Sequence, residues 1–254
     1  MKRVIVIPAR LASQRLPNKP LADIHGVPMV VRTATQAAQA SADRVVVAVD
    51  DERVAEVVTE HGFEALLTAA THPSGSDRTM EVAQRLGLED QDVVVNVQGD
   101  EPLLPPQVID ALLDFVGTDT DTEIATVAEP LSSTADFLNP NVVKLVIDDR
   151  NRALYFSRAP VPYPRDEMEA LDDAGVRGLG ALRHVGMYAF RVAALADFVT
   201  QGGGRLEQTE KLEQLRWLQS GRSIAVLRWE APIPGGVDTQ ADLKMVRDII
   251  ARGG

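Results

Sequence analysis

The sequence predicts an α/β protein with a Rossmann-like, mostly parallel sheet flanked by helices. Three observations support this prediction. Strand and helix patterns alternate through the first half of the chain, the length of 254 residues suits one large domain, and the hydrophobic content of 45% is ordinary for a globular protein. Alternating strands and helices form βαβ units, whose ligands bind beyond the carboxyl ends of the strands.

The first half reads as four strands, each followed by a helix. The strongest strand patterns are RVIVIP and DVVVNVQ, whose runs of β-branched residues suit strands buried on both faces. Pro28 in a first helical turn and Gly62 at a helix end set two helix boundaries. The expected elements are strands 3–8, 43–50, 63–68 and 92–98 and helices 28–40, 51–62, 76–86 and 105–116.

The second half departs from this alternation. Helix 206–221 is expected because Leu212, Leu215 and Leu218 form one stripe and Gly221 follows it. The stretch 159–182 contains three prolines and three glycines, which predicts an irregular arm or lid. The other expected elements are strands 122–130, 141–149, 152–158, 183–191 and 223–229 and a last helix over 239–252.

Composition and motifs exclude several classes of protein. The absence of cysteine removes disulfides, thiolate nucleophiles and zinc–sulfur sites, and it fits a reducing cytoplasm. A net charge of −11 argues against a nucleic-acid partner. The sequence has no apolar run of about 18 residues and no signal-peptide pattern, so we expect no membrane association. It also lacks a P-loop and a G-x-G-x-x-G fingerprint, which disfavours a dinucleotide dehydrogenase.

A basic loop follows the first strand, in the stretch IPARLASQRLPNKPL (7–21). It contains Arg10, Arg15 and Lys19, three prolines and no glycine. Cationic side chains can hold a phosphate chain where other proteins use the amides of a glycine-rich loop. The alternative is a solvated loop whose cations balance an acidic protein.

Two aspartates lie at or near the predicted sheet edge. Asp100 in QGDEP follows strand 92–98, and Asp238 in PGGVDTQADL precedes the last helix. Because Mg²⁺ binds one or two protein carboxylates together with substrate phosphates, both residues are candidate ligands. The alternatives are a turn or cap role for Asp100 and a helix N-cap role for Asp238.

These motifs occur together in the order of a known family. The chain resembles the 3-deoxy-manno-octulosonate cytidylyltransferases (CMP-Kdo synthetases), of the nucleotide-diphospho-sugar transferase superfamily, over essentially its whole length. The resemblance rests on IPARLASQRLPNKPL, HPSGSDR, VNVQGDEP, ALYFSRAPVPYPRD, RHVGMYAF, EKLEQLRWL and PGGVDTQADL. Asn18 stands where the family usually has glycine, and Ser76 where it usually has threonine. Asparagine tolerates unusual backbone angles, so we expect the turn at residue 18 to be kept.

The resemblance implies that CTP and 3-deoxy-manno-octulosonate (Kdo) give CMP-Kdo and pyrophosphate, for lipopolysaccharide biosynthesis, with Mg²⁺ as cofactor. It also implies a cytoplasmic homodimer whose contact includes the arm 159–182. We expect one nucleotidyltransferase domain over 1–254, with a sugar-binding and dimerisation subregion at approximately 122–192.

The resemblance further assigns residues to roles. The catalytic positions are Lys19, Asp100 and Arg15, and the metal ligands are Asp100 and Asp238. The nucleotide-binding positions are Pro8, Ala9, Arg10, Arg15, Lys19, Ser74, Arg78 and Gln98. The sugar-binding positions are Arg158, His184, Tyr188, Glu213 and Gln214.

Residue chemistry bears on the sugar-binding positions. The guanidinium fork of Arg158 matches a carboxylate. His184 and Tyr188 lie four residues apart on one strand, so their side chains share a face. Each residue also has an alternative interpretation without a sugar contact. His184 would be a hydrogen-bonded histidine within a strand, Tyr188 a core residue with a bonded hydroxyl, and Glu213 a solvated charge on a helix.

Two other functions remain open from the sequence. One is a cytidylyltransferase for a different ulosonic acid, such as 8-amino-Kdo or a sialic-type acid. The other is a catalytically silent nucleotide-binding protein on the same fold.

Overall fold

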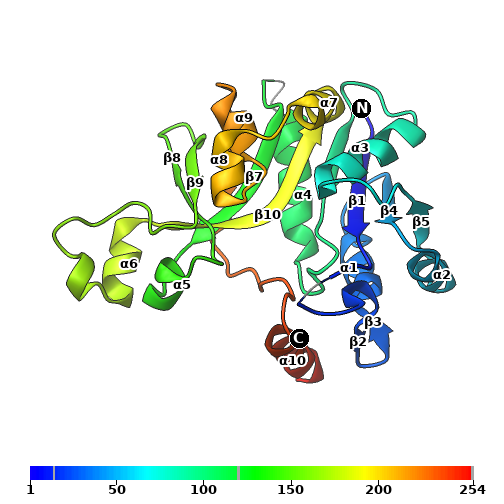
Figure 1. Cartoon of the computed structure of the whole chain (residues 1–254), viewed down its shortest axis with the longest axis horizontal. Helices are drawn as coiled ribbons and strands as arrows, with labels where there is room; N and C mark the ends of the chain where they lie inside the picture. The colour runs from blue at the N-terminus through cyan, green and yellow to red at the C-terminus, as the bar shows by residue number, and fades with distance from the viewer. Residues whose placement is uncertain (14, 119–120, 253–254) are drawn as a thin grey trace.

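The computed structural model describes residues 1–13, 15–118 and 121–252, so Gln14 of the predicted basic loop lies outside the described residues. Its centre is a sheet with strand order β11-β7-β10-β6-β1-β4-β5 (Figure 1). Along this order β5, β4, β1 and β6 run parallel, β10 is antiparallel to both of its neighbours, and β11 is parallel to β7. The predicted α/β class with a mostly parallel sheet is confirmed.

The first half of the chain contributes four strands to the sheet. Its strands are β1 (Arg3–Ala9), β4 (Arg44–Val49), β5 (Glu64–Leu67) and β6 (Val93–Asn96), with a small hairpin of β2 (Asp23–Ile24) and β3 (Val27–Pro28). Its helices are η1 (Lys19–Leu21), α1 (Met29–Ala37), α2 (Glu52–Glu60), α3 (Gly75–Arg85) and α4 (Pro106–Thr118). Pro28 is the N-cap of α1 rather than part of its first turn, while Asp51 and Ser74 cap α2 and α3 with their side chains.

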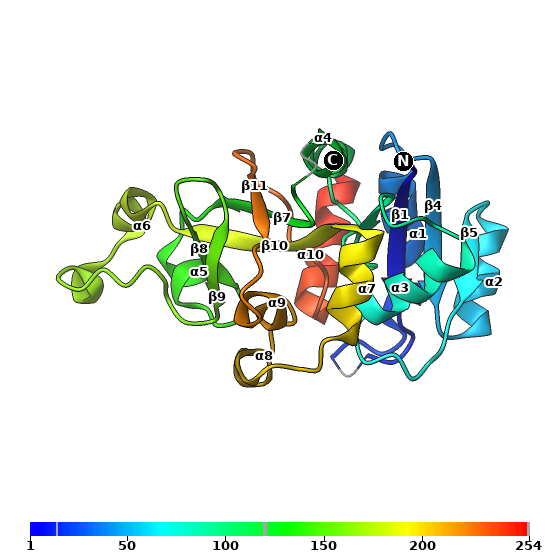
Figure 2. The same ribbon diagram turned by 90° about the horizontal axis from the view of Figure 1, so that it is seen from above.

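The side chains of β1 alternate between two cores. Ile5 and Ile7 pack on the face covered by α1, α2 and α4, whereas Val4 and Val6 pack on the face covered by α3 and α7 (Val192–Thr200). Figure 2 shows α4 on one side of the sheet and α3 and α7 on the other. All four side chains are at most 2% exposed, and each contributes about 1.5–3 kcal/mol through burial. The sheet is therefore a rigid base whose carboxyl edge can hold a site.

The second half contains β7 (Ile124–Pro130), β8 (Lys144–Ile147), β9 (Ala153–Ser157), β10 (Leu182–Arg191) and β11 (Ala225–Arg228). The three predicted consecutive strands exist, but the prediction missed α5 (Thr134–Leu138) between the first two. They also do not form a meander. β7 pairs with β10 and β11, while β8 and β9 form a hairpin that joins the beginning of β10.

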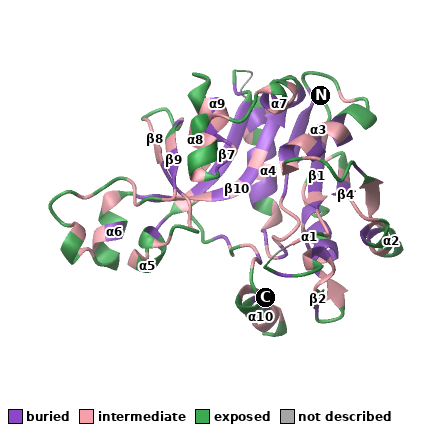
Figure 3. Ribbon diagram, in the orientation of Figure 1, coloured by how far each residue is buried: buried purple, intermediate pink, exposed green. Residues whose placement is uncertain are grey.

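The arm 159–182 is less irregular than expected. It contains η2 (Met168–Ala170) and α6 (Asp173–Leu179), and Gly180 ends α6 at φ +62°. Val176 of α6 packs with Phe137 of α5 in a small core of its own. This seven-residue helix contains two glycines, and because glycine has a low helix propensity the sequence did not predict it. Figures 1 and 3 show α5 and α6 at one end of the molecule, with much of α6 exposed.

The predicted helix 206–221 is wrong as a single element. The structure has α8 (Arg205–Glu210) and α9 (Leu215–Gln219), because Lys211 adopts φ +55° and ends the first. The guanidinium of Arg158 donates to the carbonyl of Glu210 at 2.7 Å, at the C-terminal end of α8. Glu213 and Gln214 therefore lie in a turn between two short helices and not on a helical stripe.

The terminal helix α10 (Gln240–Ala251) packs against the beginning of the chain. Leu16 of the basic loop and Ile24 of β2 share one core with Val237, Leu243 and Val246. The two ends of the sequence thus build one wall of the same region. No helix among the described residues is long and apolar enough to cross a bilayer.

Candidate active site

A cavity of about 420 Å³ lies at the carboxyl ends of β1 and β6. It brings together most of the predicted nucleotide-binding positions and both predicted metal ligands. The residues that line it are Pro8, Ala9, Arg10, Ala12, Ser13, Arg15, Lys19, Pro20, Gly75, Gln98, Gly99, Asp100 and Asp238. The basic loop and the two aspartates therefore face each other across one space, as the sequence predicts.

Lys19 lies between the two aspartates. Its ammonium donates to Asp100 and, at 2.9 Å, to Asp238. Burial opposes the charged form, but Asp100 and Asp238 outweigh it and the pKa of Lys19 is raised. Asn18 precedes it at φ +52°, so the turn expected there is present.

Asp238 is free to face the cavity because a neighbour caps the helix. Thr239 is the N-cap of α10 and forms a capping box with Asp242. The carboxylate of Asp238 instead accepts from Lys19 and forms an ion pair with Arg15 at 3.0 Å. Neither aspartate caps a helix, since α4 begins only at Pro106, although Asp100 does lie in a turn as its alternative has it.

The two aspartates fit a magnesium ion. Their oxygens converge on the single cation of Lys19, so they are close enough to share a positive charge. Within the described residues no group of three or more histidine, aspartate or glutamate side chains is placed to hold a metal. Two carboxylates leave positions for phosphate oxygens and water, which suits Mg²⁺.

Glu101 is an acidic group whose surroundings the sequence reading missed. Burial, with Asp100 beside it, raises the pKa of Glu101 to about 8. A Cβ at Gly236 would approach Glu101 Oε1 to 3.2 Å, so the segment that leads to Asp238 passes directly against this side chain. The adjacent acids in QGDEP could have predicted this raised pKa, because each of two neighbouring carboxylates disfavours the charged form of the other.

Gly99 marks a close approach between two parts of the site. A Cβ there would lie 2.8 Å from the carbonyl oxygen of Pro8, a separation too short for these two atoms, so the backbone would have to shift. We expect Gly99→Ala to lower the free energy of unfolding by about 1–3 kcal/mol, because the two backbones must separate. Urea unfolding measures this, with Gly178→Ala as the control. Gly178 lies in helix α6 with nothing within 4 Å, so its replacement has no such cost.

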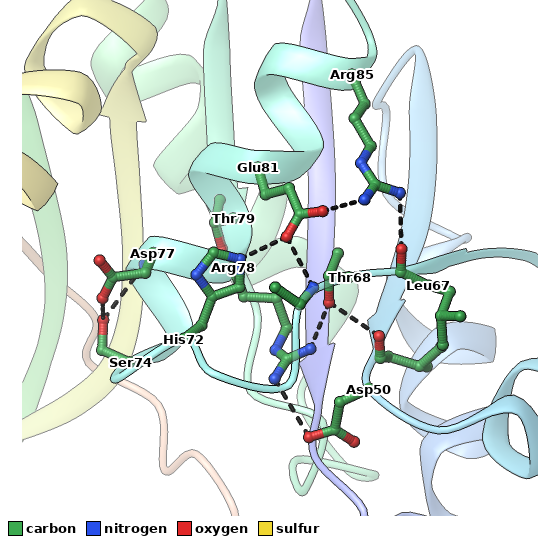
Figure 4. Close-up of polar contacts among 12 residues, drawn as sticks. Asp50, Leu67, Thr68, His72, Ser74, Asp77, Arg78, Thr79, Glu81 and Arg85 are labelled. Atoms are coloured by element: carbon green, nitrogen blue, oxygen red, sulfur yellow. Dashed lines mark hydrogen bonds and ion pairs between the residues drawn. The ribbon is translucent and has the colours of Figure 1, made fainter.

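Arg78 lies behind the cavity wall and not in it. The side chain is fully buried, and burial lowers its pKa. It donates to the hydroxyl of Thr68 and, at 3.3 Å, to Asp50 (Figure 4). The other carboxylate oxygen of Asp50 accepts from the amide of Leu11 at 2.9 Å. Arg78 thus reaches the basic loop through Asp50, and its direct contact with a nucleotide stays a prediction.

The loop before α3 is fixed by Glu81. That carboxylate accepts from the amide of Ala69, from His72 and from Arg85 (Figure 4). The loop ends at Ser74, whose hydroxyl contacts Asp77 and lies 3.0 Å from Glu213. Ser74 does not line the large cavity, but its partner Glu213 lines a second hollow.

The second hollow, of about 120 Å³, adjoins the first, since Gly75 and Gln98 line both. Its other lining residues are Ser76, Asn96, Tyr188, Phe190, Phe198, Glu213 and Gln214. Three buried polar atoms here have no hydrogen-bond partner within the described chain: Tyr188 Oη, Asn96 Oδ1 and Gln214 Nε2. Such atoms are costly unless a ligand or water satisfies them, so the hollow is suited to a polar ligand.

Glu213 is held in an unusual state in this hollow. Burial raises the pKa of its carboxyl group above the ordinary value, although Ser76 and Arg216 act in the opposite direction. A solvated helix charge, which was the alternative, does not describe it.

Two predicted sugar-binding residues lie outside both hollows. His184 packs edge-on to Phe156, 5.0 Å between ring centroids, and contacts the hydroxyl of Thr126 at 3.0 Å. Burial lowers its pKa to about 3, so it is neutral. Arg158 donates to the carbonyls of Glu210, Pro140 and Lys211. Their roles toward a sugar stay predictions.

His184 and Tyr188 do share a face, as predicted, although β10 is irregular between them. The register to β7 shifts between Val185 and Tyr188 by two residues, an even number that keeps the alternation of side chains. The two rings lie 5.3 Å apart.

Comparison with known proteins decides the family. A family model described as cytidylyltransferase matches residues 4–224. The chain belongs to the cytidylyltransferase family. It is 48% identical, over 255 residues and with both chains fully covered, to a 3-deoxy-manno-octulosonate cytidylyltransferase from Cellvibrio japonicus (strain Ueda107).

Solved structures agree with this assignment to the cytidylyltransferase family. A CMP:2-keto-3-deoxy-manno-octonic acid synthetase complexed with CTP superimposes with a TM-score of 0.89 and 40% identity, covering 99% of each chain. A cytidylyltransferase from Leptospira borgpetersenii serovar Hardjo-bovis (strain JB197) has a TM-score of 0.63 and 14% identity, covering 99% of this chain and 87% of that one, and shows a shared fold alone. The expected family, fold and enzyme class, a nucleotidyltransferase, are confirmed.

Proposed function

We propose that the protein transfers the cytidylyl group of CTP to Kdo, giving CMP-Kdo and pyrophosphate. The observation that carries the proposal is the pair of adjoining hollows. One is lined by three loop cations opposite Asp100 and Asp238, and the other holds unpartnered polar atoms. The full-length likeness to a 3-deoxy-manno-octulosonate cytidylyltransferase supports the choice of substrates.

The chemistry requires cancellation of negative charge. CTP carries about four negative charges and the sugar a carboxylate, and two unit charges 4 Å apart repel by about 4 kcal/mol at an effective dielectric constant near 20. Arg10, Arg15 and Lys19 line the larger hollow and would bind the triphosphate. Asp100 and Asp238 would hold Mg²⁺, which when bound supplies further positive charge beside the phosphates.

The reaction itself is a displacement at phosphorus. The anomeric hydroxyl oxygen of the sugar forms a bond to the α-phosphorus, the bond from this phosphorus to the bridging oxygen breaks, and pyrophosphate leaves with that oxygen. The hydroxyl proton is released to solvent. In such transfers positioning and charge stabilisation supply most of the rate enhancement, so the chain needs no covalent intermediate.

The smaller hollow would bind the sugar hydroxyls. Tyr188 Oη and Gln214 Nε2 offer groups that no protein atom within the described residues satisfies. Glu213, whose pKa burial raises, lines the same hollow, and its oxygens can accept hydrogen bonds from sugar hydroxyls.

We expect Tyr188→Phe to lower kcat/KM for Kdo by about three- to ten-fold, the scale of one hydrogen bond. The KM for CTP and the free energy of unfolding should stay close to wild type, because the lost hydroxyl has no hydrogen-bond partner among the described residues. Steady-state kinetics with a pyrophosphate readout and urea unfolding measure these quantities. Tyr163→Phe, on the exposed arm, is the matched control. Unchanged use of Kdo would remove Tyr188 from the sugar site.

A substrate panel tests the proposed function. Four nucleotides are combined with Kdo, 8-amino-Kdo and a sialic acid, and pyrophosphate release is measured. We expect release with CTP and Kdo together with Mg²⁺. Preference for another ulosonic acid would favour the alternative cytidylyltransferase, and nucleotide binding without release would favour a catalytically silent protein.

We further propose that the protein works as a cytoplasmic homodimer in lipopolysaccharide biosynthesis. Exposed apolar side chains on and beside the arm support a protein contact there. Leu154 is 61% and Tyr163 is 64% exposed. Light scattering in solution measures the mass, and a monomer at micromolar concentration would contradict the proposed dimer.

A further inference from the structure

Asp238 stands at the end of a long segment without regular structure. Residues 229–239 connect β11 to α10 and contain neither helix nor strand (Figure 1). Backbone hydrogen bonds hold the segment at both ends. The amide of Trp229 donates to the backbone carbonyl of Ala128 at 2.8 Å, and the amide of Val237 donates to the backbone carbonyl of Asp100 at 2.8 Å. Gly235 and Gly236 precede Val237, and glycine permits many backbone conformations.

Between these two hydrogen bonds the segment is anchored at one residue, Ile233. Its amide donates to Glu129 Oε2 at 2.6 Å, and its carbonyl accepts from Arg183 Nη2 at 2.6 Å. Arg183 Nε also donates to Glu129 Oε1 at 2.6 Å, so the two side chains form an ion pair that binds both polar groups of one peptide residue. Ile233 lies between two prolines, which have no amide hydrogen to offer.

The ion pair is built on the sheet. Glu129 of β7 and Arg183 of β10 are directly opposite each other in the antiparallel ladder. Both side chains are largely buried, with 12% and 21% exposed. Charged hydrogen bonds that are shielded from water are stronger than exposed ones, and groups fixed on strands hold their positions well.

We propose that Glu129 and Arg183 are positioning residues for Asp238. By holding Ile233 against the sheet, they direct the backbone past Glu101 at Gly236 and so place the Asp238 carboxylate opposite Asp100. This inference rests on the proposed function, because it concerns the metal ligands of that reaction. Neither residue lines the cavity or touches a position where substrate would lie.

The test uses Glu129→Gln in the full chain, with two readouts that need no sugar. Hydrogen exchange is followed in peptides that cover 229–239, and CTP affinity is measured by calorimetry with Mg²⁺ and with EDTA. We expect faster exchange in the segment and an about ten-fold loss of the Mg²⁺-dependent gain in CTP affinity, as for other groups that orient metal ligands. Affinity in EDTA should stay at the wild-type value.

A matched control is Glu64→Gln, which breaks the two-bond ion pair with Arg44 at the other end of the sheet. It should leave both readouts unchanged. Arg183→Lys keeps the positive charge but loses the guanidinium group that binds Glu129 and the carbonyl of Ile233 together. If Glu129→Gln does not fold, this variant is measured against the wild type with the same two readouts. A full Mg²⁺-dependent gain in either folded variant, or unchanged exchange in 229–239, would overturn the proposal. Wild-type turnover with Kdo tests the proposed function separately.

Discussion

Asp100→Asn is expected to lower kcat by at least about 100-fold, the scale of losing a charge contact in a transition state. Asp100 and Asp238 converge on one cation, and an amide cannot replace the charge that this position supplies. The loss should appear in kcat with Kdo and CTP at saturation and should not be restored by excess Mg²⁺. Pyrophosphate release in steady state measures it.

The fold should tolerate this substitution, because an asparagine oxygen still accepts from Lys19. Far-ultraviolet circular dichroism and urea unfolding check that point. Asp114→Asn, which affects an exposed ion pair with Arg3 far from the cavity, is the control and should keep wild-type kinetics. Near-normal activity of Asp100→Asn would exclude Asp100 from a metal site.

Lys19→Ala is expected to lower kcat/KM for CTP by about 100-fold while leaving the preference among sugars unchanged. The substitution removes a triphosphate contact and also leaves the carboxylates of Asp100 and Asp238 without their shared cation. Kinetics with varied CTP at fixed Kdo measure the loss in CTP use. The same measurement with a second ulosonic acid shows whether the preference among sugars has changed.

The control for this variant is Lys244→Ala, which removes an exposed lysine paired with Asp248 on α10. It should change neither constant. If Lys19→Ala used CTP as well as the wild type does, the basic loop would be a solvated surface loop, as the alternative interpretation has it.

The first half of the fold was predictable because its signals are local. Runs such as RVIVI identify strands buried on both faces, and caps such as Ser74 fix where helices begin. Parallel strands then bring Arg10 and Asp100 to the same edge of the sheet, although 90 residues separate them in sequence. The position of the larger hollow could therefore be predicted from the order of strands and helices.

The second half was less predictable because tertiary contacts override the local pattern. The leucine stripe predicts one helix, but Lys211 adopts a left-handed conformation where Arg158 binds the end of α8. Similarly, the motif predicts a nucleotide contact for Arg78, but it does not indicate that the side chain is buried beside Asp50. No sequence pattern states which partner a buried polar side chain will find.

The shared core of Leu16, Val237 and Leu243 also has a consequence for synthesis of the chain. The ribosome makes the basic loop more than 200 residues before Val237 and Leu243, against which it packs. Because nascent chains fold progressively from the N-terminus, the strands of the first half can assemble while the loop is still uncovered and Arg15 and Lys19 still lack Asp238. The cleft therefore gains this wall only after residues 237–246 have been made, and a chain that stops before them lacks one side of the pocket.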